Sequence, residues 1–192
     1  MDKGESHSMQ PRIYITGASC SGVTTLGTRL SQRLGLVHVD ADDHYWLPTS
    51  PPFTDKRAPE ARVVSIRNAL GASGWVLTGS FDGWGDALIV GVDLIVFVST
   101  PTPIRMERLF ERERQRYGSR IQPGGDMHGV HAKFAAWARE YDNSGFEGRN
   151  RARHERWLNA QTARVLRVDG TQPPDTMAEQ TIRELNMAHP NS

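Results

Sequence analysis

The sequence has little cysteine and no long apolar run. Cys20 is the only cysteine in 192 residues, which excludes an internal disulfide and a zinc site built from several thiolates. The longest apolar run, Ala87–Val98, is interrupted by Gly91 and Asp93 and is too short to span a bilayer. Residues 1–10 lack the apolar centre of a signal peptide and read as a flexible extension or tag remnant. We therefore predict a cytoplasmic protein with no membrane partner.

Lysine is also scarce, because the sequence holds 3 lysines and 20 arginines. The formal net charge is only +1, so no overall field attracts nucleic acid. Arginine offers a planar fork that suits phosphate and carboxylate groups, although a GC-rich genome also enriches this residue. The length fits one domain, for which we predict residues 11–187, followed by a tail at 188–192.

Short apolar runs alternate with segments of helical periodicity. This alternation predicts an α/β fold with a parallel sheet. The expected strands are 12–16, 36–39, 74–78, 93–99 and 164–168. The expected helices are about 23–34, 58–71, 102–118, 128–142, 150–162 and 174–187.

The stretch "GASCSGVTT" follows the first expected strand and resembles a phosphate-binding loop. Gly17 and Gly22 permit a close approach of backbone to phosphate, and the following helix directs its N–H groups at the anion. Thr24 stands where a hydroxyl ligates Mg²⁺, beside Thr25. A purely structural strand-to-helix turn is the alternative.

Val23 occupies the position of the lysine that ordinarily reaches the β- and γ-phosphates. Valine keeps the backbone N–H but supplies no charge. Loss of one preorganised donor costs on the order of 10²–10³ in rate if nothing compensates for it. Binding can survive, because much of the phosphate cradle is main chain.

Arginines elsewhere are the predicted source of the missing charge. One stripe with helical spacing leads into a glycine-rich loop that could close as a lid, and a second group follows another glycine. The alternative is a solvated helix face balanced by glutamates. The first stripe is Arg105, Arg108, Arg112 and Arg116, flanked by Arg114 and Arg120. The second group is Arg149, Arg151 and Arg153.

Acidic residues follow the second expected strand. Asp40, Asp42 and Asp43 would lie beside the phosphate loop in a doubly wound sheet. Their carboxylates could hold Mg²⁺ through water or take a proton from an attacking hydroxyl. A helix cap or turn is the alternative.

Two further segments follow strands in the same way. Asp82 and Trp84, after the third strand, and Trp46 could bind an acceptor, or the tryptophans could simply anchor loops. Asp169 and Gly170 follow the last strand, where backbone could hold an adenine.

These motifs together resemble the nucleoside monophosphate kinase branch of P-loop proteins. The sequence is similar, more closely, to bacterial adenylate-kinase-like or AAA-family ATPases, whose loop often lacks the lysine as well. The resemblance rests on "GASCSGVTT", "DADDHYWLP", "GSFDGWGD", "ERERQRYG", "RIQPGGDM" and the final "VDG". It implies a three-layer, doubly wound sheet of five parallel strands with helices on both faces. It also implies ATP and Mg²⁺ as cofactors, a small-molecule phosphoryl acceptor, and an arginine-bearing lid at about 112–130.

We assign site residues from the motifs and this resemblance together. The predicted nucleotide-binding residues are Gly17, Ala18, Ser19, Cys20, Ser21, Gly22, Val23, Thr24, Thr25, Asp169 and Gly170. The predicted catalytic residues are Asp40, Asp42, Arg112, Arg116 and Arg120, with Thr24 and Asp42 as metal ligands. The predicted acceptor-binding residues are Asp43, Trp46, Asp82 and Trp84.

Three functions are compatible with these patterns. The first is an ATP-dependent phosphotransferase that acts on a small acceptor. The second is a nucleotide-binding regulatory protein with little turnover, as the absence of the lysine would suggest. The third is a nucleic-acid-binding protein that uses the arginine stripe, which the near-neutral charge disfavours.

Overall fold

The structure is a computed structural model that describes residues 10–50, 52–81 and 83–188. Asp82, residues 1–9 of the predicted extension and residues 189–192 of the predicted tail lie outside the described residues. Within those described ranges, the helices are too short or too polar to cross a membrane.

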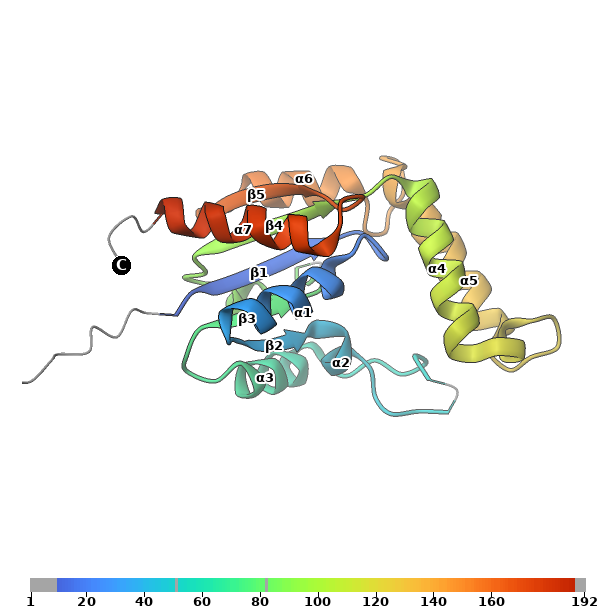
Figure 1. The fold of residues 1–192 in the computed structure, drawn as a ribbon. Helices are drawn as coiled ribbons and strands as arrows, with labels where there is room; N and C mark the ends of the chain where they lie inside the picture. Colours follow the sequence, from blue (N-terminus) through green and yellow to red (C-terminus); the bar gives the residue numbers. More distant parts are fainter. Residues whose placement is uncertain (1–9, 51, 82, 189–192) are drawn as a thin grey trace, which may run out of the picture.

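The centre of the molecule is a sheet of five parallel strands (Figure 1). Its order is β2-β3-β1-β4-β5. The strands are β1 (Arg12–Gly17), β2 (Val37–Asp40), β3 (Trp75–Thr78), β4 (Leu94–Ser99) and β5 (Arg164–Asp169). The α/β prediction is confirmed, because short apolar runs covered on both faces leave a parallel sheet as the stable arrangement.

The helices largely match the expected segments. They are α1 (Val23–Leu34), α2 (Ala41–Tyr45), α3 (Pro59–Leu70), α4 (Thr102–Tyr117), α5 (His128–Arg139), α6 (Arg151–Asn159) and α7 (Pro174–Ala188). Three 3₁₀ turns accompany them: η1 (Asp86–Leu88), η2 (Gly118–Ile121) and η3 (Glu140–Asp142). The sequence did not predict α2, because a helix of one turn has no apolar periodicity.

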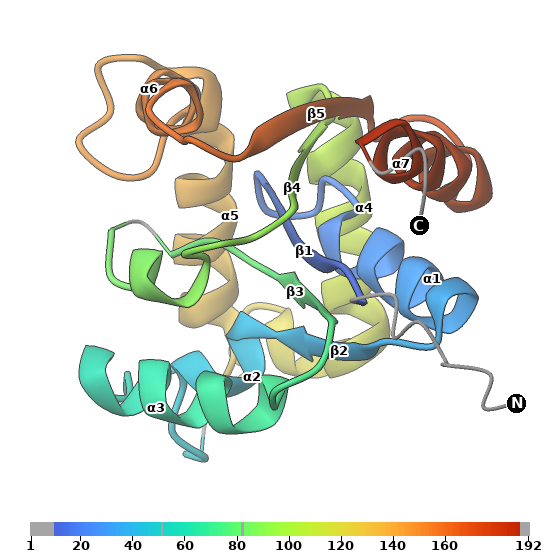
Figure 2. The same ribbon diagram turned by 90° about the vertical axis from the view of Figure 1, so that its left-hand side faces the viewer.

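Side chains that alternate along the strands build two hydrophobic cores, one on each face of the sheet. Ile13 and Ile15 of β1 face a core shared with α1 and α7. Tyr14 faces the opposite core, which Ile66 of α3 and Leu158 of α6 complete. Figure 2 shows α1 and α7 on one side of the sheet and α3 and α6 on the other. This is the predicted three-layer arrangement.

The hairpin of α4 and α5 projects away from the sheet (Figure 1). Its two helices pack through a small apolar cluster of Met106, Leu109, Ala135 and Ala138. The predicted lid residues, about 112–130, occupy the outer part of this hairpin.

The strand order reverses beside β1, because α1 leads the chain towards β2 whereas β4 pairs on the other side of β1. Ligands of open α/β sheets bind at the carboxyl ends of the strands where the order reverses. In this chain the loop "GASCSGVTT" occupies that point.

Candidate active site

The loop between β1 and α1 leaves backbone N–H groups open at the start of a helix. Gly22, directly before α1, has a φ of 108°, and no side chain caps the helix. Cys20 also adopts a left-handed conformation, with a φ of 62°. The first N–H groups of a helix lack partners within it and carry the positive end of its dipole. Such a helix start is suited to bind an anion.

The loop lies tightly against the ends of the neighbouring strands. A Cβ on Gly17 would meet Ser21 Oγ at 2.5 Å and the Val98 carbonyl oxygen at 2.6 Å, so the position requires glycine. Thr100 Oγ1 donates a hydrogen bond of 2.8 Å to the Ser21 carbonyl oxygen. Ala18 is buried, whereas Thr25 is exposed in the first turn of α1. The cradle is therefore preorganised by the protein itself.

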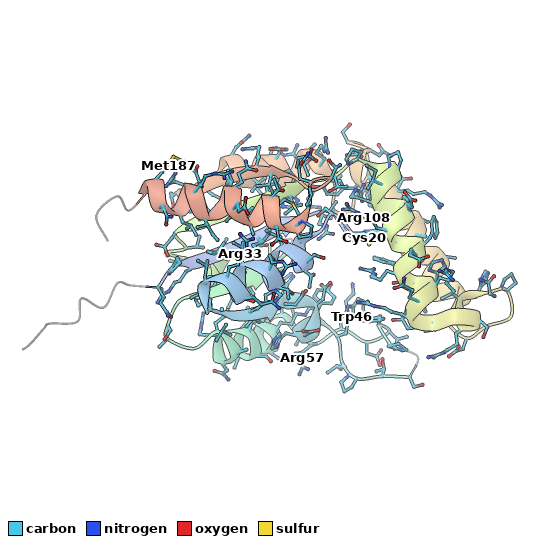
Figure 3. The ribbon with its side chains drawn as sticks, in the orientation of Figure 1. Cys20, Arg33, Trp46, Arg57, Arg108 and Met187 are labelled. Carbon is cyan, nitrogen blue, oxygen red and sulfur yellow. The ribbon has the colours of Figure 1, made fainter. Side chains whose placement is uncertain are left out.

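Two arginines of α4 also hold the loop. Arg105 is 1% exposed and donates to the carbonyl oxygens of Thr100 (3.2 Å) and Ser19 (3.4 Å). Arg108 donates to the carbonyl oxygens of Ser21 (3.4 Å) and Gly170 (3.0 Å). Figure 3 shows Arg108 and Cys20 close together where the hairpin meets the sheet. The base of the hairpin and the phosphate loop therefore form one connected unit.

The acidic segment meets the loop through Asp40. Thr24 Oγ1 donates a hydrogen bond of 2.7 Å to Asp40 Oδ2. The other carboxylate oxygen accepts from the Asp42 N–H at 3.0 Å and caps α2. The cap that was the alternative for Asp40 is therefore present, and its functional role stays a prediction.

The oxygen atoms here fit Mg²⁺ together with a nucleotide. The described residues contain no cluster of three or more histidine, cysteine or acidic side chains that could hold a metal by itself. Mg²⁺ commonly takes one or two carboxylates and completes its shell with phosphate oxygens and water. The Thr24 hydroxyl and the Asp40 carboxylate, which hydrogen-bond to each other, are the groups that would hold it.

Asp42 lies in a setting that favours its neutral form. Its side chain is open to water, but surrounding protein partly desolvates it and raises the pKa above the usual value for aspartate. The charge of Asp40 raises this pKa further, whereas Arg149 and Arg112 oppose the shift. A carboxylate with a raised pKa beside a phosphate loop is suited to accept a proton from a hydroxyl.

The three predicted arginine donors lie at different positions along the hairpin, from the middle of α4 to its outer end. Arg112 Nη2 pairs with Glu113 Oε1 at 3.2 Å, and its charge acts on both Asp42 and Cys20. Arg116 is exposed in the last turn of α4, and its charge also acts on Cys20. Arg120 pairs with Asp126 at 2.6 Å at the outer end. Arg112 is therefore the best placed of the three in this conformation.

Arg149 is a neighbour of the loop that the sequence grouped with Arg151 and Arg153 as a possible source of the missing charge, but that the assigned site residues did not include. Its Nη2 donates to Ser19 Oγ at 3.1 Å across 130 residues of sequence. The sequence offered only a weak signal, an arginine between a glycine and a helix cap, because no spacing rule relates positions so far apart.

A cavity of about 160 Å³ opens beside Arg149. Tyr14, Phe81 and Trp157 provide aromatic walls. Arg153 and His154 of α6 add polar groups. This small, partly open hollow combines aromatic walls with a few polar groups, the kind of lining that small-molecule sites have.

The described residues among those predicted to bind an acceptor do not line this cavity. Trp46 packs on Tyr45, with ring centroids 4.9 Å apart, and Trp84 packs on Phe81 at 5.2 Å. Asp43 is exposed on α2. These tryptophan contacts match the alternative considered from the sequence, in which the rings anchor loops.

The segment after β5 approaches the phosphate loop through its backbone. Gly170 N–H donates to the Ser99 carbonyl oxygen at 2.8 Å, and the Gly170 carbonyl oxygen accepts from Arg108. The Asp169 carboxylate turns instead into its own turn, where bonds from Thr171 lower its pKa. Gly170 is therefore closer to the expected nucleotide than the Asp169 side chain.

Solved structures with a similar fold include proteins described as kinases. One is a sugar kinase from Janibacter sp. HTCC2649, with a TM-score of 0.54 and 18% identity over 93% of this chain and 96% of that one. Another is a gluconokinase from Sinorhizobium meliloti 1021, with a TM-score of 0.55 and 18% identity over 94% of both chains. An uncharacterized protein from Eubacterium ventriosum ATCC 27560 has a TM-score of 0.52 and 13% identity over 92% of this chain and 99% of that one. These likenesses show that the chain shares the α/β fold of these proteins.

Sequence comparison identifies a nearer relative. No family model matches the sequence. The uncharacterized protein YqaC of Bacillus subtilis (strain 168) is 43% identical over 162 residues, which cover 84% of this chain and 89% of that protein. At this identity and coverage, the chain belongs to the same family as YqaC.

Proposed function

We propose that the chain is an ATP-dependent phosphotransferase that transfers the γ-phosphoryl group of Mg-ATP to a hydroxyl group of a small acceptor. One observation carries the proposal: the 2.7 Å hydrogen bond from Thr24 Oγ1 to Asp40 Oδ2. It joins the hydroxyl at the metal position of the phosphate loop to the acidic end of β2. Phosphoryl transfer requires this combination of phosphate cradle, metal ligands and a nearby base.

The nucleotide would bind with its phosphates over the loop. The open N–H groups at the start of α1 would contact the β-phosphate region, and the backbone near Gly170 would face the nucleoside. Thr24 and Asp40 would hold Mg²⁺, which would neutralise charge at the phosphates.

The acceptor would occupy the cavity beside Arg149. Aromatic walls suit the flat or apolar face of a ring, and Arg153 suits an anionic or polyhydroxylated substituent. Asp42 takes the proton of the attacking hydroxyl, the new O–P bond forms, and the bond between the γ-phosphorus and the bridging oxygen breaks to release ADP. The kinases with similar folds suggest sugars and sugar acids as the first acceptors to assay.

The first test is thermal unfolding with ADP or ATP, with and without Mg²⁺. A ligand that binds only the folded state stabilises it by about 2.7 kcal/mol at a hundred times its Kd. We expect a Mg²⁺-dependent shift that is lost in Thr24→Ala. The matched control is Thr28→Ala, one turn further along α1, whose hydroxyl bonds back to the Thr24 carbonyl oxygen.

Turnover separates an enzyme from a regulatory nucleotide-binding protein. We expect acceptor-dependent ADP formation that Asp42→Asn abolishes. Nucleotide binding without turnover on any acceptor would favour the regulatory alternative, which Val23 suggests. Absence of binding to any nucleotide would overturn both functions.

A further inference from the structure

Arg149 reaches the phosphate loop from the segment directly before α6. Besides the hydrogen bond to Ser19 Oγ, its guanidinium lies over the ring of Trp137 in α5, 5.1 Å from the centroid. The side chain thus lies between the loop and the inner part of the hairpin. It also borders the cavity proposed for the acceptor.

The backbone that carries Arg149 is held on both sides. Asn150 is 3% exposed and caps α6, where its Oδ1 accepts from Arg153 N–H at 2.9 Å. Its Nδ2 donates to the Phe146 carbonyl oxygen at 2.7 Å. A cation needs such support to act at a defined point, because a loosely held arginine loses side-chain entropy on every contact.

The charge of Arg149 is not neutralised in the described structure. Its Nε is buried without a hydrogen-bond partner. No described carboxylate forms an ion pair with its guanidinium, whereas Arg112 pairs with Glu113. Arg105 and Arg108 already bind backbone carbonyls. A partly buried cation without a counter-charge is costly and is stabilised by an arriving anion.

The usual position of the phosphate-binding lysine holds no charge. The Val23 side chain is partly buried against the core between β1 and α1. Arg149 approaches the same loop from the opposite end of the motif, at Ser19.

We propose that Arg149 takes the place of the missing lysine and contacts the γ-phosphate of a nucleotide bound in the loop. This inference rests on the proposed function. Arg149 stays protonated throughout and forms no covalent bond. Its fork neutralises charge on the γ-phosphate oxygens and holds the group in line between the nucleotide and the acceptor.

The test compares ATP with ADP, because only ATP carries the group that Arg149 would contact. Calorimetric titration with Mg²⁺ gives both dissociation constants for the wild type and Arg149→Met. We expect ATP affinity to fall about tenfold to a hundredfold, as for loss of a charged hydrogen bond, with ADP affinity changed less than about threefold. The matched control is Arg156→Met, an exposed arginine further along α6.

A reciprocal substitution shows whether Arg149 acts through its positive charge or only by supporting the loop. Val23→Lys, placed in the Arg149→Met background, should restore the preference for ATP. Arg149→Lys keeps a charge and should retain most of that preference, and it serves as the second variant if Arg149→Met does not fold. Unfolding temperatures without ligand report the folding of each variant.

The outcomes separate this inference from the proposed function. Equal losses for ATP and ADP in Arg149→Met would overturn the inference, because they would show that the residue only supports the loop. An unchanged ATP preference would overturn it as well, while leaving nucleotide binding intact. A wild type that binds neither nucleotide would overturn the proposed function, and this inference with it.

Discussion

Thr24 and Asp40 join the first turn of α1 to the end of β2 through one hydrogen bond of 2.7 Å. The contact links a residue of the phosphate loop to a residue 16 positions later. Asp40 also caps α2, the helix that carries Asp42. A substitution at Thr24 would therefore also alter the contacts of the residue that holds this helix in place. Asp40 thus connects the loop to the proposed base, Asp42, through two hydrogen bonds.

Asp40→Asn should remove the Mg²⁺ dependence of nucleotide binding. The amide oxygen of asparagine can still accept from the Asp42 N–H and cap α2, and its NH2 group can donate to the Thr24 hydroxyl, but it lacks the charge that attracts the metal. We expect ADP affinity without Mg²⁺ to stay within about threefold of the wild type, with the gain from Mg²⁺ lost. Titration with and without Mg²⁺ measures both, and Glu60→Gln, in the exposed first turn of α3, is the control. A retained Mg²⁺ effect would exclude Asp40 from the metal site.

Asp42→Asn should raise stability while it abolishes turnover. The folded state raises the pKa of Asp42, so the ionised side chain disfavours folding above the ordinary aspartate pKa. The stability advantage of the asparagine variant should be present at neutral pH and vanish below about pH 3.8. Urea unfolding at several pH values measures it. An asparagine variant that is less stable at neutral pH would contradict the raised pKa.

His154 should make the protein lose stability as the pH falls below 6.5. It is buried between the Tyr141 hydroxyl and Thr16 Oγ1, and burial lowers its pKa to about 3. The unfolded chain therefore binds a proton at a pH where the folded chain does not. We expect a loss of about 1 kcal/mol per pH unit between pH 6 and pH 4 relative to His154→Gln. If the unfolding free energies of the wild type and of His154→Gln fell in parallel with pH, His154 would be protonated in the folded state.

Arg105→Met should destabilise the protein and weaken nucleotide binding together. The guanidinium of Arg105 is fully buried, and its loss leaves the carbonyl oxygens of Thr100 and Ser19 without this donor. We expect a cost of about 2–4 kcal/mol in unfolding free energy. The control is Arg114→Met, whose exposed pair with Glu111 should contribute less than about 1 kcal/mol. Equal effects of the two substitutions on urea unfolding would contradict the structural role of Arg105.

The sequence predicted the five strands to within one residue at each end, because apolar runs bounded by glycine, proline and aspartate determine strands locally. The same local signals identified the loop from Gly17 to Thr25. α2 was missed because a helix of five residues shows no apolar periodicity, although a cap among the aspartates had been considered.

The partners of the arginines could not be predicted from local sequence patterns. Helical spacing grouped Arg105, Arg108, Arg112 and Arg116 on one stripe, yet they hold different partners. Arg105 is in the core, whereas Arg116 is exposed. Which of them approaches the loop depends on how α4 crosses the end of the sheet, and spacing along one helix contains no information on that crossing.

The attachment of α4 has a mechanical consequence. α4 is 16 residues long; its first turns are fastened to the phosphate loop by Arg105 and Arg108, and the rest of the helix runs on without a strand beneath it (Figure 1). Such a helix is about 24 Å long, so a turn of roughly 10° at its base carries its far end by about 4 Å. Through this attachment, a small adjustment of the loop around a phosphate would displace the far end of α4 by several times as much.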